Sequence, residues 1–234
     1  MRAISTDISI SQGFEKIWQK LSAIRQTLAK ATVLGMSLDV LFLAAMIGIC
    51  NFHILTGQSG ANLLFQYDKV MSGQIYRLVT HPFVHLSWYH FLLDTGAFIL
   101  LYAGINEKGK LRKMLIVAIC GACGLIVPLI FAPAIYTNGL CGLSGIAHGL
   151  MAFSALEMMQ DKANLQSGLI CLLAVVFKSV YEAATGEVLF SFLQFGLCGI
   201  PIAICHAGGV IGGILSYFIV EYANFSKPIC SAKG

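Results

Sequence analysis

The sequence predicts an all-α membrane protein that crosses the bilayer several times, and composition is the first reason. Of its 234 residues, 57 % are hydrophobic and only 11 % are charged, and the mean hydropathy is +0.79. A soluble domain carries about 25 % charged residues, so water could not solvate this surface on all sides. The second reason is that the apolar residues fall into long runs. We therefore exclude a disordered chain, a nucleic-acid-binding protein and an ordinary soluble enzyme, and expect the lipid bilayer as partner.

Six stretches are long enough to cross a membrane, because a bilayer core takes about 20 apolar helical residues. They are 37–55, 88–105, 113–132, 141–159, 166–184 and 200–221. The pattern divides the chain into an amphipathic segment on the membrane surface (1–36), a six-helix membrane domain (37–222) and a tail (223–234). The connection 56–87 between the first two helices is predicted to be a structured hairpin that lies partly in the interface.

The distribution of Lys and Arg predicts the orientation, since cytoplasmic loops carry an excess of both residues. Most of them lie in the N-terminal segment, the loops after the second and fourth helices, and the tail: Arg2, Lys16, Lys20, Arg25, Lys30, Lys108, Lys110, Arg112, Lys113, Lys162, Lys227 and Lys233. The connection 56–87 holds only Lys69 and Arg77. We therefore expect a multi-pass protein of the cytoplasmic (inner) membrane with both termini in the cytoplasm and this connection outside.

In this orientation, the second, fourth and sixth spans all begin at the outer face. Their first two turns hold polar residues: His90 and Asp94, then Ser144 and His148, then His206. Polar groups inside a membrane are costly and usually functional. A serine hydroxyl becomes a nucleophile when a base within about 2.6–3.2 Å takes its proton. The sequence thus predicts that a hydroxyl, several imidazoles and a carboxyl gather at one depth beneath the outer surface.

Glycines accompany both Ser144 and His206. Ser144 lies within the motif Gly142-Leu143-Ser144-Gly145, and His206 precedes the pairs Gly208-Gly209 and Gly212-Gly213. Small residues let membrane helices approach closely, so we expect the fourth and sixth helices to touch and bring Ser144 to His206. Taken singly, each residue also has an ordinary explanation, because a serine can bond its own helix and a histidine can bridge two helices.

In their order along the chain, these motifs resemble the rhomboid family of intramembrane serine proteases. The matching residues are Tyr76-Arg77, His81, His85, His90, Asp94, Gly142-Leu143-Ser144-Gly145, Gly149, His206, Gly209 and Gly213. The resemblance implies a six-helix rhomboid-like bundle and a Ser–His dyad, with Ser144 as nucleophile and His206 as general base. It also implies an oxyanion site made of His90, Asp94 and the Ser144 backbone N–H, near the outer face.

The resemblance assigns structural roles to the remaining matched residues. Arg77, His81 and His85 would hold the outer loop in place rather than react. The glycines would serve substrate approach and helix packing: Gly142, Gly145, Gly149, Gly209 and Gly213.

Two positions depart from the family pattern. Most rhomboids have Asn where this chain has Asp94, and an ionised carboxylate there would repel an oxyanion. Asp94 must therefore be protonated, or else orient His90, and the sequence leaves both options open. Many rhomboids carry a Tyr one turn after the serine, where this chain has His148. We interpret His148 as a support for His206, with a rival base as the other option.

The pair His148-Gly149, together with Lys178, Tyr181 and Glu182, resembles the rhombosortase branch of the family. That branch is associated with exported proteins whose C-terminal tail has a Gly-Gly motif, a membrane helix and basic residues. The implied partners are single-span membrane proteins with such a tail, and other single-span substrates are the alternative. Lys178 and Glu182, four residues apart on one helix, are interpreted as a pair that neutralises itself.

Other classes of protein stay open. Six histidines in an apolar chain could bind haem for electron transfer, through His81 with His85 or His90 with His206. A zinc site is less favoured, because the glutamate of H-E-x-x-H is absent and Pro82 disrupts a helix through His81 and His85. A non-catalytic rhomboid relative is the third alternative, but such relatives typically lack the serine or the histidine, and this chain has both Ser144 and His206. We therefore expect a protease that needs no cofactor and no metal.

Overall fold

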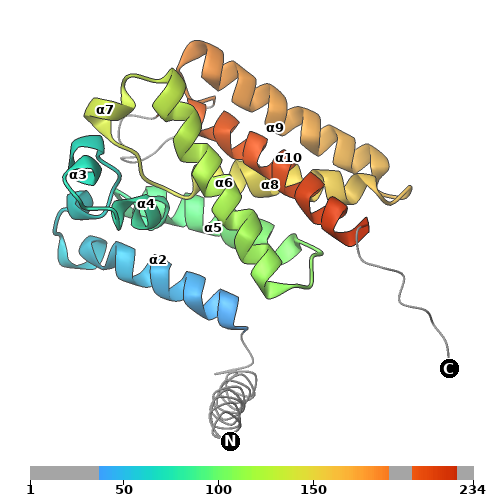
Figure 1. Ribbon diagram of the computed structural model, residues 1–234, viewed down its shortest axis with the longest axis horizontal. Coiled ribbons are helices and arrows are strands. Elements are labelled where there is room, and N and C mark those ends of the chain that lie inside the picture. The colour runs from blue at the N-terminus through green and yellow to red at the C-terminus, as the bar shows by residue number, and fades with distance from the viewer. Residues whose placement is uncertain (1–36, 190–201, 226–234) are drawn as a thin grey trace, which may run out of the picture. The chain divides into compact units, whose positions relative to one another are not determined.

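The computed structural model describes residues 37–189 and 202–225 (Figure 1). The predicted surface segment 1–36 and most of the predicted tail lie outside the described residues. The chain divides into two compact units, 1–42 and 43–234. Helix α2 begins in the first unit, and the helices after it belong to the second.

The regular elements of the described part are all helical. The long helices are α2 (Leu38–Thr56), α5 (Trp88–Gly104), α6 (Lys110–Phe131), α8 (Ser144–Met159), α9 (Leu165–Thr185) and α10 (Ile204–Phe225). The short ones are η2 (Gly60–Asn62), α3 (Tyr67–Met71), α4 (Arg77–Thr80), η3 (His81–Phe83) and α7 (Ile135–Asn138). Each predicted span therefore overlaps a long helix, although the first two residues of the sixth span lie outside the described residues.

Within the described residues, four helices are long and apolar enough to cross a membrane: α2, α6, α9 and α10. The all-α, multi-pass prediction is confirmed at this level. With 17 and 16 residues, α5 and α8 are shorter than those four. The fourth span was predicted from residue 141, but α8 begins at Ser144, because Gly142 has a φ of +97° that cannot continue a right-handed helix.

Helix α10 packs against both α6 and α8, and α9 lies along α8 (Figure 1). Glycines allow this packing. A Cβ on Gly209 or Gly213 would overlap the carbonyl oxygen of Gly145 or Gly149 on α8. On the face toward α6, a Cβ on Gly212 would lie 2.8 Å from the Cα of Cys120. Only glycine permits the backbone of α10 to approach both neighbours this closely.

Arg77 ties the connection between α2 and α5 together. Its buried guanidinium donates to the carbonyl oxygens of Ala61 and Leu64 at 2.8 and 2.7 Å, and to the side chain of Gln74 at 2.8 Å. A charge-assisted donor with three acceptors fixes an irregular segment more firmly than a neutral one. The connection is therefore ordered through short helices and this arginine, while the predicted hairpin lying partly in the membrane interface stays a prediction.

Two buried histidines follow in this connection. The ring Nδ1 of His81 hydrogen-bonds the carbonyl oxygen of Arg77 at 3.0 Å. The backbone N–H of His85 donates to Oδ1 of Asn51 on α2 at 2.9 Å, and its Nδ1 lies 3.0 Å from the same oxygen. Burial lowers the pKa of His81 and that of His85 to about 4 each, because desolvation disfavours a charged imidazole. Both rings are therefore neutral at pH 7.

Candidate active site

A sharp turn before α8 makes Ser144 the first residue of that helix. The turn depends on Gly142, since its φ of +97° lies in the region that favours glycine. A Cβ at Gly142 would also lie 2.7 Å from Nε2 of His90 and 2.8 Å from Oδ2 of Asp94. The Gly142 N–H donates to the carbonyl oxygen of His81 at 3.2 Å. The start of α8 is thus held against α5 and the connection between α2 and α5.

The hydroxyl of Ser144 meets the imidazole of His206 from α10. The distance between Oγ of Ser144 and Nε2 of His206 is 3.0 Å, within the reach of a hydrogen bond. Gly145 allows this approach, because a Cβ there would lie 3.2 Å from the carbonyl oxygen of Cys205. His206 is buried, and Ser144 is half-buried. The pair has the geometry of a nucleophile beside its base.

The other ring nitrogen of His206 contacts a carboxylate. Nδ1 of His206 lies 2.6 Å from Oε2 of Glu182 on α9, and the Glu182 side chain is fully buried. Oε1 of Glu182 accepts from Nζ of Lys178 at 2.5 Å and from the backbone N–H of Leu189 at 2.9 Å. Three donors around one carboxylate suit its ionised form, which can only accept. Because an ionised carboxylate cannot donate, Nδ1 of His206 carries the proton of this hydrogen bond, and in a neutral imidazole Nε2 then presents a lone pair to Ser144.

Interpreting Glu182 only as the neutralising partner of Lys178 was therefore incomplete. The Lys178–Glu182 ion pair does exist, but it occupies one carboxylate oxygen and leaves the other to His206. The signal in the sequence was a carboxylate inside an apolar helix, which is costly in a membrane and usually has a function.

His148 lies between Ser144 and Lys178 and stacks on His206. Its Nδ1 donates to the carbonyl oxygen of Ser144 at 2.7 Å, and its Nε2 accepts from Nζ of Lys178 at 2.9 Å. The rings of His148 and His206 are 4.0 Å apart and nearly parallel. Because both of its nitrogens are engaged elsewhere, His148 has no free lone pair for the Ser144 hydroxyl.

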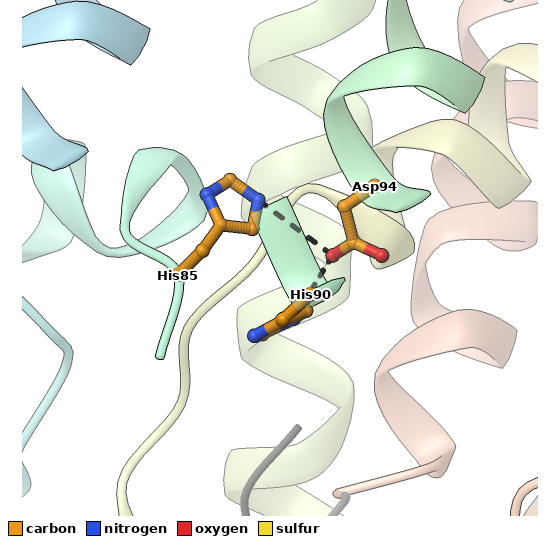
Figure 2. A group of neighbouring side chains, drawn as sticks. All are labelled: His85, His90 and Asp94. Carbon is orange, nitrogen blue, oxygen red and sulfur yellow. Dashed lines mark ion pairs between the residues drawn. The ribbon is translucent and has the colours of Figure 1, made fainter. Parts of the chain in front are cut away.

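Asp94 lies beside two hydrogen-bond donors, the Ser144 backbone N–H and the ring of His90. Its Oδ2 accepts from the Ser144 backbone N–H at 3.1 Å. The same oxygen lies 3.1 Å from Nε2 of His90 (Figure 2). Nδ1 of His90 accepts from the N–H of Leu86 at 3.3 Å, so the proton of a neutral His90 is on Nε2 and is donated to Asp94. In this state, Asp94 occupies the two donors that the oxyanion site was expected to use.

His85 lies closer to this site than its predicted role in the outer loop implied. Its ring points at Asp94, with Nε2 3.8 Å from Oδ2 (Figure 2). Because Nδ1 of His85 donates to Asn51, Nε2 carries a lone pair, and among the described residues it has no hydrogen-bond partner. The three polar residues His85, His90 and Asp94 therefore form one buried cluster, whereas Arg77 holds the connection outside it.

Two groups of side chains within the described residues have metal-ligating atoms within 4.8 Å of one another: His85, His90 and Asp94, and His148, Glu182 and His206. In the second group, hydrogen bonds already occupy the ring nitrogens and both carboxylate oxygens. In the first, Nε2 of His90 carries a proton, so it has no lone pair for an ion. Haem between His90 and His206 fits poorly as well, since each ring already bonds a carboxylate and His148 covers His206.

One comparison identifies the family of the chain. A family model described as a rhomboid domain matches residues 72–223. The matched region includes every residue of the hydrogen-bonded cluster around Ser144 and His206. No curated protein matches the chain.

Proposed function

The chain belongs to the rhomboid family of intramembrane serine proteases, and we propose that it cleaves membrane protein substrates with Ser144 as nucleophile and His206 as general base. The observation that carries this proposal is the 3.0 Å distance between Oγ of Ser144 and Nε2 of His206. The proton on Nδ1 of His206 supports it further, because Nε2 is then free to accept the proton of the hydroxyl.

The proposed reaction has two halves. As Oγ of Ser144 attacks the scissile carbonyl carbon, its proton passes to Nε2 of His206, and the carbonyl oxygen becomes an oxyanion. When the peptide C–N bond breaks, His206 gives that proton to the leaving amine, and an acyl-enzyme ester remains. Water then attacks the ester, with His206 again acting first as base and then as acid.

Stabilising the oxyanion requires a change at Asp94. The Ser144 N–H and Nε2–H of His90 are the donors nearest the nucleophile, and both bond Oδ2 of Asp94. An ionised carboxylate beside an oxyanion would repel it, whereas a neutral carboxylic acid at Asp94 could itself donate. Losing one oxyanion donor typically lowers the rate by about 10²–10³. We therefore propose that Asp94 is neutral when substrate reacts.

The substrate class follows from the resemblance to rhombosortases. His148-Gly149 and the pair of Lys178 and Glu182 support substrates that are single-span membrane proteins with a C-terminal Gly-Gly motif, helix and basic tail. Cleavage is proposed at the outer face of the cytoplasmic (inner) membrane, with both termini of the six-span enzyme in the cytoplasm. Rhomboid cleavage of other single-span proteins is the second candidate.

The test is cleavage of a Gly-Gly-tailed single-span substrate in proteoliposomes, followed by mass spectrometry of the products. The wild-type protein should release the tail, and Ser144→Ala should abolish cleavage. Ser154→Ala, the same substitution later on α8, is the matched control and should cleave normally. Cleavage by Ser144→Ala would refute the proposed nucleophile. Equal cleavage of a substrate without the Gly-Gly motif would favour the second candidate.

A further inference from the structure

Glu182 links the base of the proposed dyad to a second charged residue. It belongs to α9, whereas Ser144 begins α8 and His206 lies on α10. We propose that Glu182 is a positioning residue that completes a Ser144–His206–Glu182 triad. This inference rests on the proposed function, because it assigns a role to Glu182 through His206.

The position of the carboxylate favours this role over a simple ion pair. The attraction of Lys178 is met by Oε1, yet the Glu182 side chain also turns Oε2 toward Nδ1 of His206, at 2.6 Å. The side chain of Glu182 is 0 % exposed, while that of Lys178 is 26 % exposed. If Lys178 and Glu182 served only to neutralise each other, the carboxylate of Glu182 would not have to be buried against His206 on another helix.

A buried carboxylate at Nδ1 has two consequences for His206. It fixes the tautomer, because a proton held between Nδ1 and Oε2 leaves Nε2 as the acceptor that faces Ser144. It also stabilises the imidazolium that forms when Nε2 takes the serine proton, while the Nδ1 proton itself stays in place. Replacing the equivalent carboxylate in soluble serine proteases lowers kcat by about 10⁴.

Lys178 closes the arrangement into a ring. It donates to Oε1 of Glu182 and to Nε2 of His148, and His148 returns to Ser144 through the Ser144 carbonyl oxygen. The cation compensates the charge of Glu182, which would otherwise be costly at this depth. It also occupies the lone pair on Nε2 of His148, so this ring presents no lone pair to the Ser144 hydroxyl. The ring therefore leaves His206 as the one imidazole within it whose lone pair faces the Ser144 hydroxyl.

The experiment compares Glu182→Gln and Glu182→Asp with the wild type. Glutamine has nearly the same shape without the charge, and aspartate keeps the charge on a shorter chain. The matched control is Glu157→Gln on α8, whose carboxylate accepts from the N–H of Asn106, in the loop between α5 and α6. Readouts are kcat and KM for the Gly-Gly-tailed substrate and the rate at which a fluorophosphonate probe labels Ser144.

Glu182→Gln should lower kcat and the labelling rate by about 10²–10⁴, with KM unchanged within about threefold. Glu182→Asp should recover part of the loss, and Glu157→Gln should behave as wild type. If Glu182→Gln keeps kcat within about fivefold of wild type, Glu182 does not position the base, and the inference fails. If Glu182→Gln is active but Ser144→Ala is inactive in the same assay, only the role of Glu182 is refuted, and the proposed function is still supported.

A spectroscopic measurement covers the case in which Glu182→Gln does not fold. The wild-type protein, labelled with ¹⁵N-histidine, should show a far-downfield proton attached to Nδ1 of His206 and bonded to a carboxylate. This resonance should disappear in His206→Gln and persist in Glu157→Gln. A wild-type spectrum in which Nδ1 of His206 is unprotonated would overturn the inference without any Glu182 variant.

Discussion

The imidazole of His148 lies flat on the imidazole of His206, with ring centroids 4.0 Å apart and planes inclined by 11°. The ring of His148 is held by the Ser144 carbonyl oxygen and Lys178. The ring of His206 is held by Glu182 and the Ser144 hydroxyl. Stacking of this kind restricts rotation of the His206 ring, so the ring that we propose as the base stays aimed at Ser144.

Replacing His148 tests whether stacking is its function. His148→Tyr keeps an aromatic face over His206 and should retain cleavage activity. His148→Ala removes the stack, which is worth about 0.5–1.5 kcal/mol, and should lower kcat by about 2- to 10-fold. The measurement is kcat for the Gly-Gly-tailed substrate with folded protein. Complete loss of activity in a folded His148→Tyr would instead make His148 the base.

Substitutions at Asp94 test whether its charge opposes catalysis. Asp94→Asn removes the charge but keeps an acceptor for the Ser144 N–H and a donor for an oxyanion, so kcat should equal or exceed that of the wild type at pH 7. Asp94→Leu removes every polar atom of the side chain and should lower kcat by about 10²–10³. Inactivity of a folded Asp94→Asn would show that the carboxylate itself is required.

Much of this arrangement could be predicted, because membrane helices are recognisable in a sequence as long apolar runs. Long apolar runs located the helices, and the glycines beside Ser144 and His206 predicted contact between their two helices. Polar residues at the starts of the second, fourth and sixth predicted spans then predicted which side chains meet. These inferences need only hydropathy, helix geometry and the length of a span.

What could not be predicted depends on tertiary partners. Glu182 has a satisfactory partner four residues away, so its second contact with His206 is invisible until α9 and α10 are placed side by side. The acceptor role of Asp94 depends on the turn at Gly142, which carries the Ser144 N–H to it. His85 was assigned to the loop, because its sequence position gives no hint that its ring points at Asp94.

Close packing of α8 and α10 should make Gly209 intolerant of any side chain. In Gly209→Ala, the new methyl would overlap the carbonyl oxygen of Gly145, so the helices must separate. Overpacking costs about 1–3 kcal/mol, and the shift would also lengthen the Ser144–His206 contact. We expect a lower melting temperature and a large loss of kcat.

The matched control for this substitution is Gly96→Ala on α5, where a Cβ would meet nothing within 4 Å. Alanine has the higher helix propensity, so Gly96→Ala should leave stability unchanged or raise it slightly. Equal melting temperatures for Gly209→Ala and the wild type would contradict the close contact between α8 and α10.

Acid should destabilise the connection between α2 and α5 through its two buried histidines. Burial lowers the pKa of His81 and of His85 from 6.5 to about 4. Between these two pH values, both histidines are therefore protonated in the unfolded chain and neutral in the folded chain. Stability is then complete above pH 6.5 and falls as the pH drops toward 4, by at most about 3 kcal/mol per histidine. Thermal unfolding at pH 7.5 and 5 measures this. His81→Gln should show a smaller drop than the wild type, and an equal drop would mean that His81 does not contribute.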